Sequence, residues 1–310
     1  MNLKKPKFWD YKTPNIFAYL IYPISLTIIL INFIFNRPSK KKFKIKTICV
    51  GNIYIGGTGK TSLSISINNI LRERNLKSCF VKKYYKNQLD EQKILQNNGK
   101  LFLSSKRIDA IKQAEKENYD YAILDDGLQD QTIIFDLSFV CFNNINWIGN
   151  GMTIPSGPLR EKIGNLKKYN HLFLNGNLED IENLKREILK INSNITIHIG
   201  KYVPTNLENF KINKKYLVFS GIGNHKTFVS MIKNNGLNIL KEIEFPDHYT
   251  YKKKDIDNIL KEADKLKCEI ITTEKDYQRL ENINSEKIKI LKSELKIIDE
   301  EKLINSIILK

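Results

Sequence analysis

The sequence predicts an α/β protein with a parallel-sheet domain, a second and smaller α/β domain, and an N-terminal membrane helix. From residue 45 onward, short β-branched runs alternate with helical stretches, which is the rhythm of βαβ units. A glycine-rich loop at residues 56–61 joins the first of these runs to a helical stretch. Before it lies an almost entirely apolar stretch, Ile16–Phe35. The strand, glycine loop and helix together predict a sheet domain like that of phosphate-loop NTPases.

The apolar stretch Ile16–Phe35 is about as long as a bilayer-spanning helix, roughly 20 residues. Pro23 would kink it, and no small-residue cleavage site comes after it, so a removed signal peptide is not expected. Residues 1–40 are therefore predicted to be a membrane anchor with basic flanks, either spanning the bilayer or lying in one leaflet; the alternative is a buried core helix. The flanks carry Lys4, Lys5, Lys7 and Lys12 before the helix and, more densely, Arg37, Lys40, Lys41, Lys42, Lys44 and Lys46 after it. The heavier charge on the C-terminal side favours a cytoplasmic location for the rest of the chain.

The first α/β domain is expected over residues 41–204 and the second over residues 205–310, with an extended, turn-rich connector between them. Helical stretches separate most of the strands, which favours parallel pairing. Strands are predicted at Ile45–Val50, Ser78–Lys82, Tyr121–Leu124, Leu137–Phe142, His171–Leu174, Tyr216–Ser220, Leu240–Phe245 and Glu269–Thr272, and helices at Thr61–Arg72, Arg107–Glu117, Ile181–Lys190, Lys226–Asn234 and Lys254–Leu266.

Composition narrows the function classes. The 310 residues carry a formal net charge of +17, partly through a lysine bias spread along the chain. This charge favours anionic lipid or a phosphorylated substrate. No nucleic-acid partner is expected, because the lysines are not interleaved with aromatic residues in a recognisable motif. The four cysteines and four histidines show no metal-ligand spacing, so a zinc site or a disulfide framework is not expected.

The glycine-rich loop predicts a nucleotide site for ATP. Its glycines let successive N–H groups point at one anion, and the helix N-terminus adds partial positive charge. Lys60 would reach the β- and γ-phosphates, and the Thr61 hydroxyl would bind Mg²⁺. Tyr54 stands where the strict pattern has its first glycine, and an ordinary glycine turn is the alternative. The predicted nucleotide-binding residues are Gly56, Gly57, Thr58, Gly59, Lys60 and Thr61.

Three further segments carry chemistry. Asp125 and Asp126 follow an apolar strand, where acids organise Mg²⁺ in phosphate-loop enzymes, although Asp-Asp-Gly is also a common turn. Arg160 follows a rigid turn and would clamp a phosphate with two hydrogen bonds, the alternative being a solvated ion pair with Glu161. His248 follows Asp247 at the end of a strand and is a candidate proton acceptor, or a structural histidine.

Taken together, these motifs resemble those of the tetraacyldisaccharide 4′-kinases, the lipid A 4′-kinase family of Gram-negative bacteria. The resemblance covers nearly the whole chain and preserves the order of the motifs. It rests on Val50-Gly51-Asn52, Gly56-Gly57-Thr58-Gly59-Lys60-Thr61, Asp125-Asp126-Gly127-Leu128-Gln129, Gly149-Asn150-Gly151, Pro155-Ser156-Gly157-Pro158-Leu159-Arg160-Glu161, Gly221-Ile222-Gly223-Asn224, Phe245-Pro246-Asp247-His248 and Thr273-Glu274-Lys275-Asp276.

The resemblance implies transfer of the ATP γ-phosphate to the 4′-hydroxyl of a tetraacylated glucosamine disaccharide 1-phosphate, at the cytoplasmic face of the inner membrane. It implies no protein partner. Asp90 and His248 are the residues that match the family's hydroxyl-activating pair, and Lys60 and Arg160 complete the implied catalytic set. The implied substrate contacts are Gln129, Asn150, Arg160 and Glu161.

Two departures from the family's pattern leave alternatives open. The segment 81–86 reads Val-Lys-Lys-Tyr-Tyr-Lys where the family usually has Ser-Arg-Gly-Tyr-Gly, and the loop from there to Asp90 is short. Asp130 stands where the family has a histidine. A membrane-associated phosphate-loop NTPase switch acting on a protein partner, or an inactive homologue, are the alternatives. Against a GTPase switch, Lys275 is misplaced for a guanine-binding motif.

Overall fold

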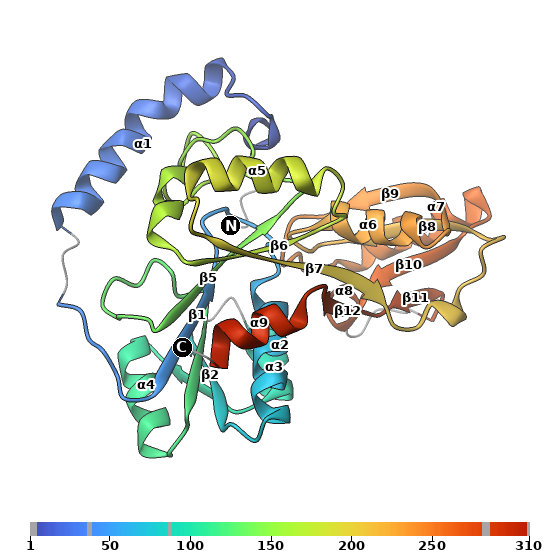
Figure 1. The fold of residues 1–310 in the computed structure, drawn as a ribbon. Helices are drawn as coiled ribbons and strands as arrows, with labels where there is room; N and C mark the ends of the chain where they lie inside the picture. The colour runs from blue at the N-terminus through green and yellow to red at the C-terminus, as the bar shows by residue number, and fades with distance from the viewer. Residues whose placement is uncertain (1–4, 36–38, 86–88, 281–285, 309–310) are drawn as a thin grey trace. The chain divides into compact units, whose positions relative to one another are not determined.

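The structure is a computed structural model that describes residues 5–35, 39–85, 89–280 and 286–308. The chain divides into two compact units (Figure 1): the larger is Pro6–Gly200 with the C-terminal segment from Ile297, and the smaller is built on Lys201–Lys296. The chain passes from one unit to the other at two points. Both points fall inside strands, β7 (Thr196–Pro204) and β12 (Ser293–Ile297), which are neighbours in the larger sheet. The predicted second domain ran to residue 310. The structure differs because β12 returns the chain to the larger unit, where α9 (Glu300–Ile308) buries Leu303 and Ile307.

The larger unit is built on an eight-stranded sheet in the order β12-β7-β6-β5-β1-β4-β2-β3. The pairings from β3 across to β7 are parallel. Its remaining strands are β1 (Lys46–Gly51), β2 (Ser78–Lys83), β3 (Leu101–Ser104), β4 (Tyr121–Asp125), β5 (Leu137–Asn143) and β6 (His171–Asn175). The helices are α1 (Ile16–Phe35), α2 (Lys60–Glu73), α3 (Leu89–Asn98), α4 (Arg107–Lys116) and α5 (Ile181–Ile191), with the short 3₁₀ helices η1 (Lys7–Asp10) and η2 (Ile163–Lys168).

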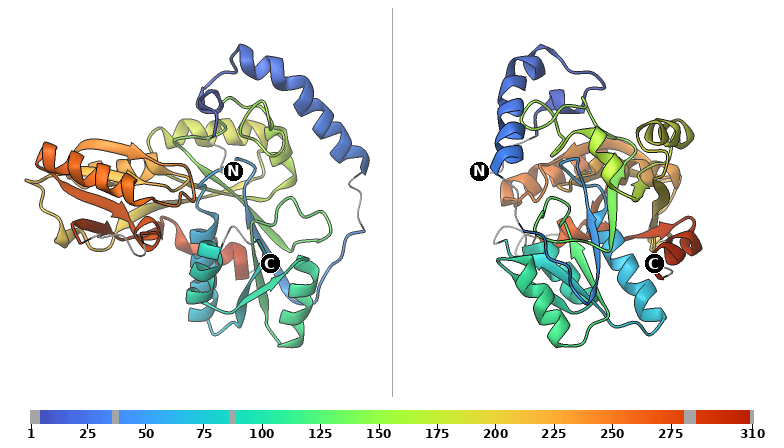
Figure 2. Two further views of the ribbon diagram at one scale, coloured as in Figure 1. Left: turned by 180° about the vertical axis from the view of Figure 1, so that it is seen from behind. Right: turned by 60° about the vertical axis from the view of Figure 1, so that its left-hand side comes forward.

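The central strands are continuous buried runs, as expected for a parallel sheet covered on both faces. All residues of β4 and β6 are buried, and so are all but the first of β1. Helices α2 and α4 cover opposite faces (Figure 2). The predicted α/β class with a mostly parallel sheet is therefore confirmed. Because β1 lies between β4 and β5, the carboxyl ends of all three strands meet at one edge.

The predicted apolar segment forms helix α1, but the membrane-spanning prediction is not supported: in the part of the chain that the structure describes, no helix is long and apolar enough to cross a membrane. The helix touches the larger unit through a polar residue at its middle. Ser25 is fully buried, donates to the Thr153 carbonyl (3.0 Å) and accepts from the Ser156 amide (3.2 Å). Neither is α1 a core helix, because Leu20 is 70% exposed. Of the predicted basic flanks, Lys4 and Arg37 lie outside the described residues.

The smaller unit has a four-stranded parallel sheet in the order β11-β10-β8-β9. Apolar clusters pack around β8, one including Tyr216 and Val218, the other Leu217 and Phe219. This alternation shows that β8 is covered on both faces. The strands are β8 (Lys215–Ser220), β9 (Asn238–Glu244), β10 (Glu269–Thr273) and β11 (Ile288–Leu291), and the helices are η3 (Leu207–Asn209), α6 (His225–Asn234), α7 (Lys253–Leu266) and α8 (Glu274–Gln278).

Candidate active site at the carboxyl edge of the larger sheet

The glycine-rich loop runs from the end of β1 to the start of α2, as the sequence predicts. Gly56 and Gly59 have φ values of +131° and +78°, which glycine adopts without the strain that a side chain brings. Thr58 between them is buried, and its side chain is held by Asn52, whose Nδ2 donates to Thr58 Oγ1 (2.9 Å). The curl of the loop is thus fixed by the glycine conformations and by this buried hydrogen bond.

Buried asparagines support this loop from the neighbouring strand ends. Asn175, the last residue of β6, donates from Nδ2 to the Thr58 carbonyl (2.7 Å). Asn143, the last residue of β5, donates to Asn175 Oδ1 (3.0 Å). Since these amides lie in the interior, each bond replaces one that water would otherwise supply. These hydrogen bonds fix the loop to the carboxyl ends of β5 and β6.

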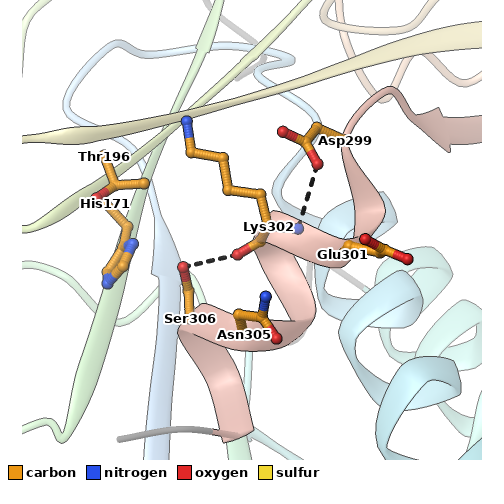
Figure 3. Close-up of a pocket in the computed structure, with 7 residues that line it drawn as sticks. All are labelled: His171, Thr196, Asp299, Glu301, Lys302, Asn305 and Ser306. Carbon is orange, nitrogen blue, oxygen red and sulfur yellow. Dashed lines mark hydrogen bonds between the residues drawn. The ribbon is translucent and has the colours of Figure 1, made fainter.

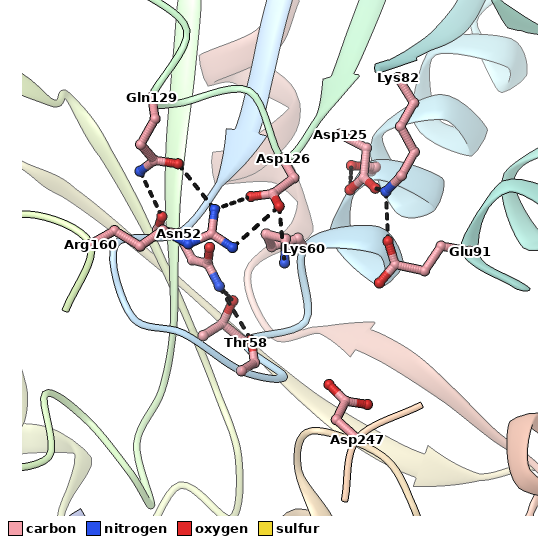
Figure 4. Close-up of polar contacts among 12 residues, drawn as sticks. Asn52, Thr58, Lys60, Lys82, Glu91, Asp125, Asp126, Gln129, Arg160 and Asp247 are labelled. Atoms are coloured by element: carbon pink, nitrogen blue, oxygen red, sulfur yellow. Dashed lines mark hydrogen bonds and ion pairs between the residues drawn. The ribbon is translucent and has the colours of Figure 1, made fainter. Parts of the chain in front are cut away.

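Asp126 lies beside two cationic side chains, Arg160 and Lys60 (Figure 4). Arg160 donates to both of its carboxylate oxygens (2.8 and 3.3 Å), and Lys60 Nζ lies 4.0 Å away. Burial by itself raises the pKa of a carboxyl group, but Lys60 and then Arg160 outweigh it, so the pKa of Asp126 is lowered. The φ of Asp126 is +58°, a conformation that aspartate tolerates better than most residues. The predicted residues Lys60, Asp126 and Arg160 therefore lie together.

The backbone places Arg160 beside the glycine-rich loop. The Arg160 amide donates to the Ile53 carbonyl (2.6 Å), and the Ile55 amide donates to the Pro158 carbonyl (2.8 Å). Gln129 completes the link, since it accepts from Arg160 (3.1 Å) and donates to the Asn52 carbonyl (3.0 Å). This short bridge explains why Arg160, far from Lys60 in sequence, reaches the same edge.

The predicted substrate contacts occupy different environments. Gln129 also donates to Glu161 (3.3 Å), which accepts from Tyr169 as well (3.0 Å). Asn150 is buried; it donates to the Ser156 carbonyl (2.9 Å) and accepts from the Met152 amide (3.1 Å). Its amide thus shapes the turn that leads to Arg160, and a substrate contact of Asn150 stays a prediction.

Asp125, the last residue of β4, is fully buried and faces a lysine. Lys82 Nζ lies 2.6 Å from Asp125 Oδ2 and 2.6 Å from Glu91 Oε2, while Ser64 donates to Asp125 Oδ1 at 3.5 Å. Asp125 and Asp126, adjacent in sequence, are therefore held by different partners. Among residues 5–35, 39–85, 89–280 and 286–308, no group of three or more histidine, cysteine, aspartate or glutamate side chains could hold a metal.

The predicted pair Asp90 and His248 lies in different units. Asp90 is partly buried in the first turn of α3 in the larger unit. His248 follows β9 in the smaller unit, with φ +56°, and its amide donates to the Gly221 carbonyl (3.1 Å). Arg279 lies next to the ring, with its guanidinium 3.5 Å from His248 Nδ1. The pairing of Asp90 with His248 stays a prediction.

The residues that sequence reasoning missed are Asn175, Asn143, Lys82 and Glu91. The asparagines end apolar strands, a position that could have marked them, because polar residues at carboxyl ends of parallel strands line ligand sites. Lys82 interrupts an apolar strand, and a buried lysine needs an anionic partner. Nothing local, however, indicates which acid that partner is.

A cavity of about 580 Å³ lies at the opposite edge of the larger sheet (Figure 3). Its lining includes His171 and Thr196, the first residues of β6 and β7, together with Lys302 and other residues of α9. Behind it, His198 is 3.2 Å from His171, and burial lowers the pKa of His198 to about 3. Ligands of parallel sheets bind at carboxyl strand ends, so this cavity is separate from the candidate site.

The chain is similar over nearly its whole length to one protein family. The family model described as tetraacyldisaccharide-1-P 4′-kinase matches residues 17–310. The tetraacyldisaccharide 4′-kinase of Pelagibacter ubique is 58% identical over 308 residues, covering 99% of this chain and 98% of that protein. That of Rickettsia canadensis is 33% identical, covering 92% and 91%. The crystal structure of LpxK from Aquifex aeolicus in complex with ATP shares the fold, with a TM-score of 0.61 at 21% identity, covering 94% of this chain and 96% of that one.

Replacing Asn175 by alanine should loosen the glycine-rich loop. The Thr58 carbonyl loses its buried donor, which should lower the free energy of unfolding by about 1–3 kcal/mol, and inorganic pyrophosphate should bind more weakly. Urea titration and calorimetry measure the two effects. Asn177→Ala is the matched control, because Asn177 bonds to Asn144 instead of the loop (2.8 Å). Equal pyrophosphate affinity in wild type and Asn175→Ala would contradict this support role.

Proposed function

The chain belongs to the tetraacyldisaccharide-1-P 4′-kinase family, and from this premise we propose that it transfers the γ-phosphate of ATP to the 4′-hydroxyl of an acylated disaccharide 1-phosphate in lipid A biosynthesis. The observation that carries the proposal is the meeting of Lys60, Arg160 and Asp126 beside the glycine-rich loop. Two cations face one carboxylate there, so the cluster keeps an excess positive charge for the transferred phosphate. Such positioned charge is the main contribution of proteins to phosphoryl transfer.

ATP fits the loop through chemistry that the chain itself supplies. The backbone N–H groups of residues 56–61 would bind phosphate oxygens, Lys60 would neutralise the charge on the β- and γ-phosphates, and Arg160 would clamp the transferred group. The side chains of Lys60 and Arg160 are 13% and 27% exposed, so both are in reach of a ligand.

Mg²⁺ fits the donor set if phosphate oxygens and water complete its shell. Mg²⁺ is commonly held by one or two carboxylates plus substrate phosphates, so a dense cluster of acids is not required. Thr61 and Asp126 would hold the ion, whereas Asp125 is fully buried against Lys82 and would act through water. The bound ion would neutralise charge on the β- and γ-phosphates.

Asp90 and His248 are proposed to activate the acceptor hydroxyl. Asp90 would orient the imidazole and stabilise its charged form as His248 takes the proton. The two residues belong to different units, and their pairing is proposed for the substrate-bound enzyme.

Access to an acylated lipid is proposed to come through α1, at the cytoplasmic face of the inner membrane. The helix exposes large apolar side chains: Ile16, Phe17, Tyr19, Leu20, Ile24, Leu26, Ile28, Leu30 and Ile31 are each more than 40% exposed. An exposed apolar helix surface of this kind would gain free energy by burial in the lipid of a membrane. Lysines at both flanks, Lys12 and Lys40 among them, would attract anionic headgroups.

The direct test is incubation of purified protein with ATP, Mg²⁺ and an acylated disaccharide 1-phosphate. The lipid product should gain the mass of one phosphate. Lys60→Ala should reduce kcat by about 10²–10³-fold, because a charge that stabilises the transferred phosphate is lost. Lys93→Ala, an exposed lysine of the same unit, is the control. Near-normal turnover in Lys60→Ala would remove the phosphate-loop assignment.

The proposed base makes a non-additive prediction. His248→Ala and Asp90→Ala should each lower kcat strongly while leaving ATP affinity nearly unchanged, and the double variant should be little worse than either single one. His248→Ala should also lose the acidic limb of the pH–rate profile. Steady-state kinetics of the three variants measures this. Losses that simply multiply in the double variant would show that the two residues act independently.

The membrane role of α1 is tested by a double variant, Leu20→Gln with Ile24→Gln, on one face of the helix. Both residues are exposed, so folding should survive, and binding to vesicles of anionic phospholipid should weaken at least roughly tenfold as apolar burial is lost. Ile212→Gln, which changes an exposed isoleucine of the smaller unit, is the control. Unchanged co-sedimentation of the double variant would assign membrane binding to the basic surface instead.

A further inference from the structure

Lys82 is a charged side chain in the interior of the larger unit. It is the fifth residue of β2 and is 1% exposed, although lysine is rarely buried unless it is paired. Burial lowers the pKa of a lysine, but here the carboxylates of Asp125 and Glu91 outweigh it and the pKa of Lys82 is raised. The ammonium group therefore stays charged at neutral pH.

The two carboxylates that share this ammonium come from different elements (Figure 4). Asp125 ends β4, a direct parallel neighbour of β2. Glu91 belongs to the first turn of α3, the turn that also contains Asp90. Each carboxylate lies 2.6 Å from Lys82 Nζ. Lys82 thus connects the first turn of α3 to the carboxyl edge of the sheet.

The ammonium group of Lys82 is taken up by its two carboxylates and is not presented to solvent, since 1% of the side chain is exposed. An ion pair of this kind is costly to break, because either carboxylate left alone inside the protein lacks a counter-charge. The bridge joins β4 to the turn of α3 that contains Asp90.

We propose that Lys82 is a positioning residue: its ammonium bridges Glu91 to Asp125 and so holds the first turn of α3, with Asp90, at the carboxyl edge of the larger sheet. The proposal rests on the proposed function, in which Asp90 helps to activate the acceptor hydroxyl. A small displacement of a reacting group lowers the rate steeply, so the bridge should matter for turnover more than for nucleotide binding.

Glu91→Gln is the sharpest test, because it removes the charge that pairs α3 with Lys82 and leaves the Lys82–Asp125 pair in place. The side chain of Glu91 is 18% exposed and Lys82 keeps Asp125 as its partner, so the fold should survive. We expect kcat to fall roughly ten- to hundredfold, with KM for ATP unchanged within about twofold. Hydrogen exchange of the amides of residues 93–96, whose helical bonds end in that turn, should accelerate by about tenfold or more.

Matched variants separate this role from a general loss of stability. Glu73→Gln, at an exposed position at the end of α2, should match wild type in both measurements. Lys82→Arg keeps a cation between the carboxylates and should retain more kcat than Lys82→Met. If Lys82→Met does not fold, Glu91→Gln still decides.

Two outcomes would overturn the proposal: wild-type kcat in Glu91→Gln, whatever its exchange rates, or wild-type exchange in α3. Failure of wild-type protein to phosphorylate the lipid would count against the proposed function instead. In that event the exchange comparison would still report whether the bridge holds α3.

Discussion

Hydrogen bonds from buried asparagines to the glycine-rich loop at residues 56–61 are the contacts on which the carboxyl edge of the larger sheet depends. Asn52 and Asn175 make these bonds to Thr58, from the ends of β1 and β6. The glycines at positions 56 and 59 adopt positive φ, which makes the curl cheap. A loop held rigidly in this way would not have to reorganise when a ligand binds, which is the condition for electrostatic preorganisation.

The two adjacent aspartates at the end of β4 belong to two different clusters of charged side chains. Asp126 faces two cations, Lys60 and Arg160, and that cluster carries a net positive charge toward the loop. Asp125 shares one cation, Lys82, with Glu91, and that cluster is net negative and buried. Asp126 follows the strand in the αL conformation, and the two neighbouring carboxylates have different partners.

The sequence predicted what local pattern determines and missed what tertiary pairing determines. Buried strands such as β4 and the helix α2 were predicted within a few residues, because apolar runs and the glycine loop mark them directly. Helix α3 and strand β3 were not expected, since the polar segment 89–104 has weak periodicity; in the structure, Glu91 of α3 pairs with the buried Lys82. Lys60, Arg160 and Asp126 were expected at one site and lie together. The partner of Asp125 could not be predicted, because no local signal couples a lysine on one strand to a carboxylate on another.

Hydrogen bonds link the N-terminal segment and α1 to the turn that leads to Arg160. Trp9 donates from its indole nitrogen to the Pro155 carbonyl (3.0 Å), and its own carbonyl accepts from the backbone N–H of Asn150 (2.9 Å). The Ser25 hydroxyl accepts from the backbone N–H of Ser156. The turn held in this way is too tight for any residue but glycine at position 157, where a Cβ would lie 2.1 Å from Asn150 Oδ1. Two residues further on, the chain reaches Leu159 and then Arg160, whose amide is fixed by Ile53. Hydrogen bonds therefore connect α1 to the turn that leads to Arg160, whose guanidinium faces Asp126.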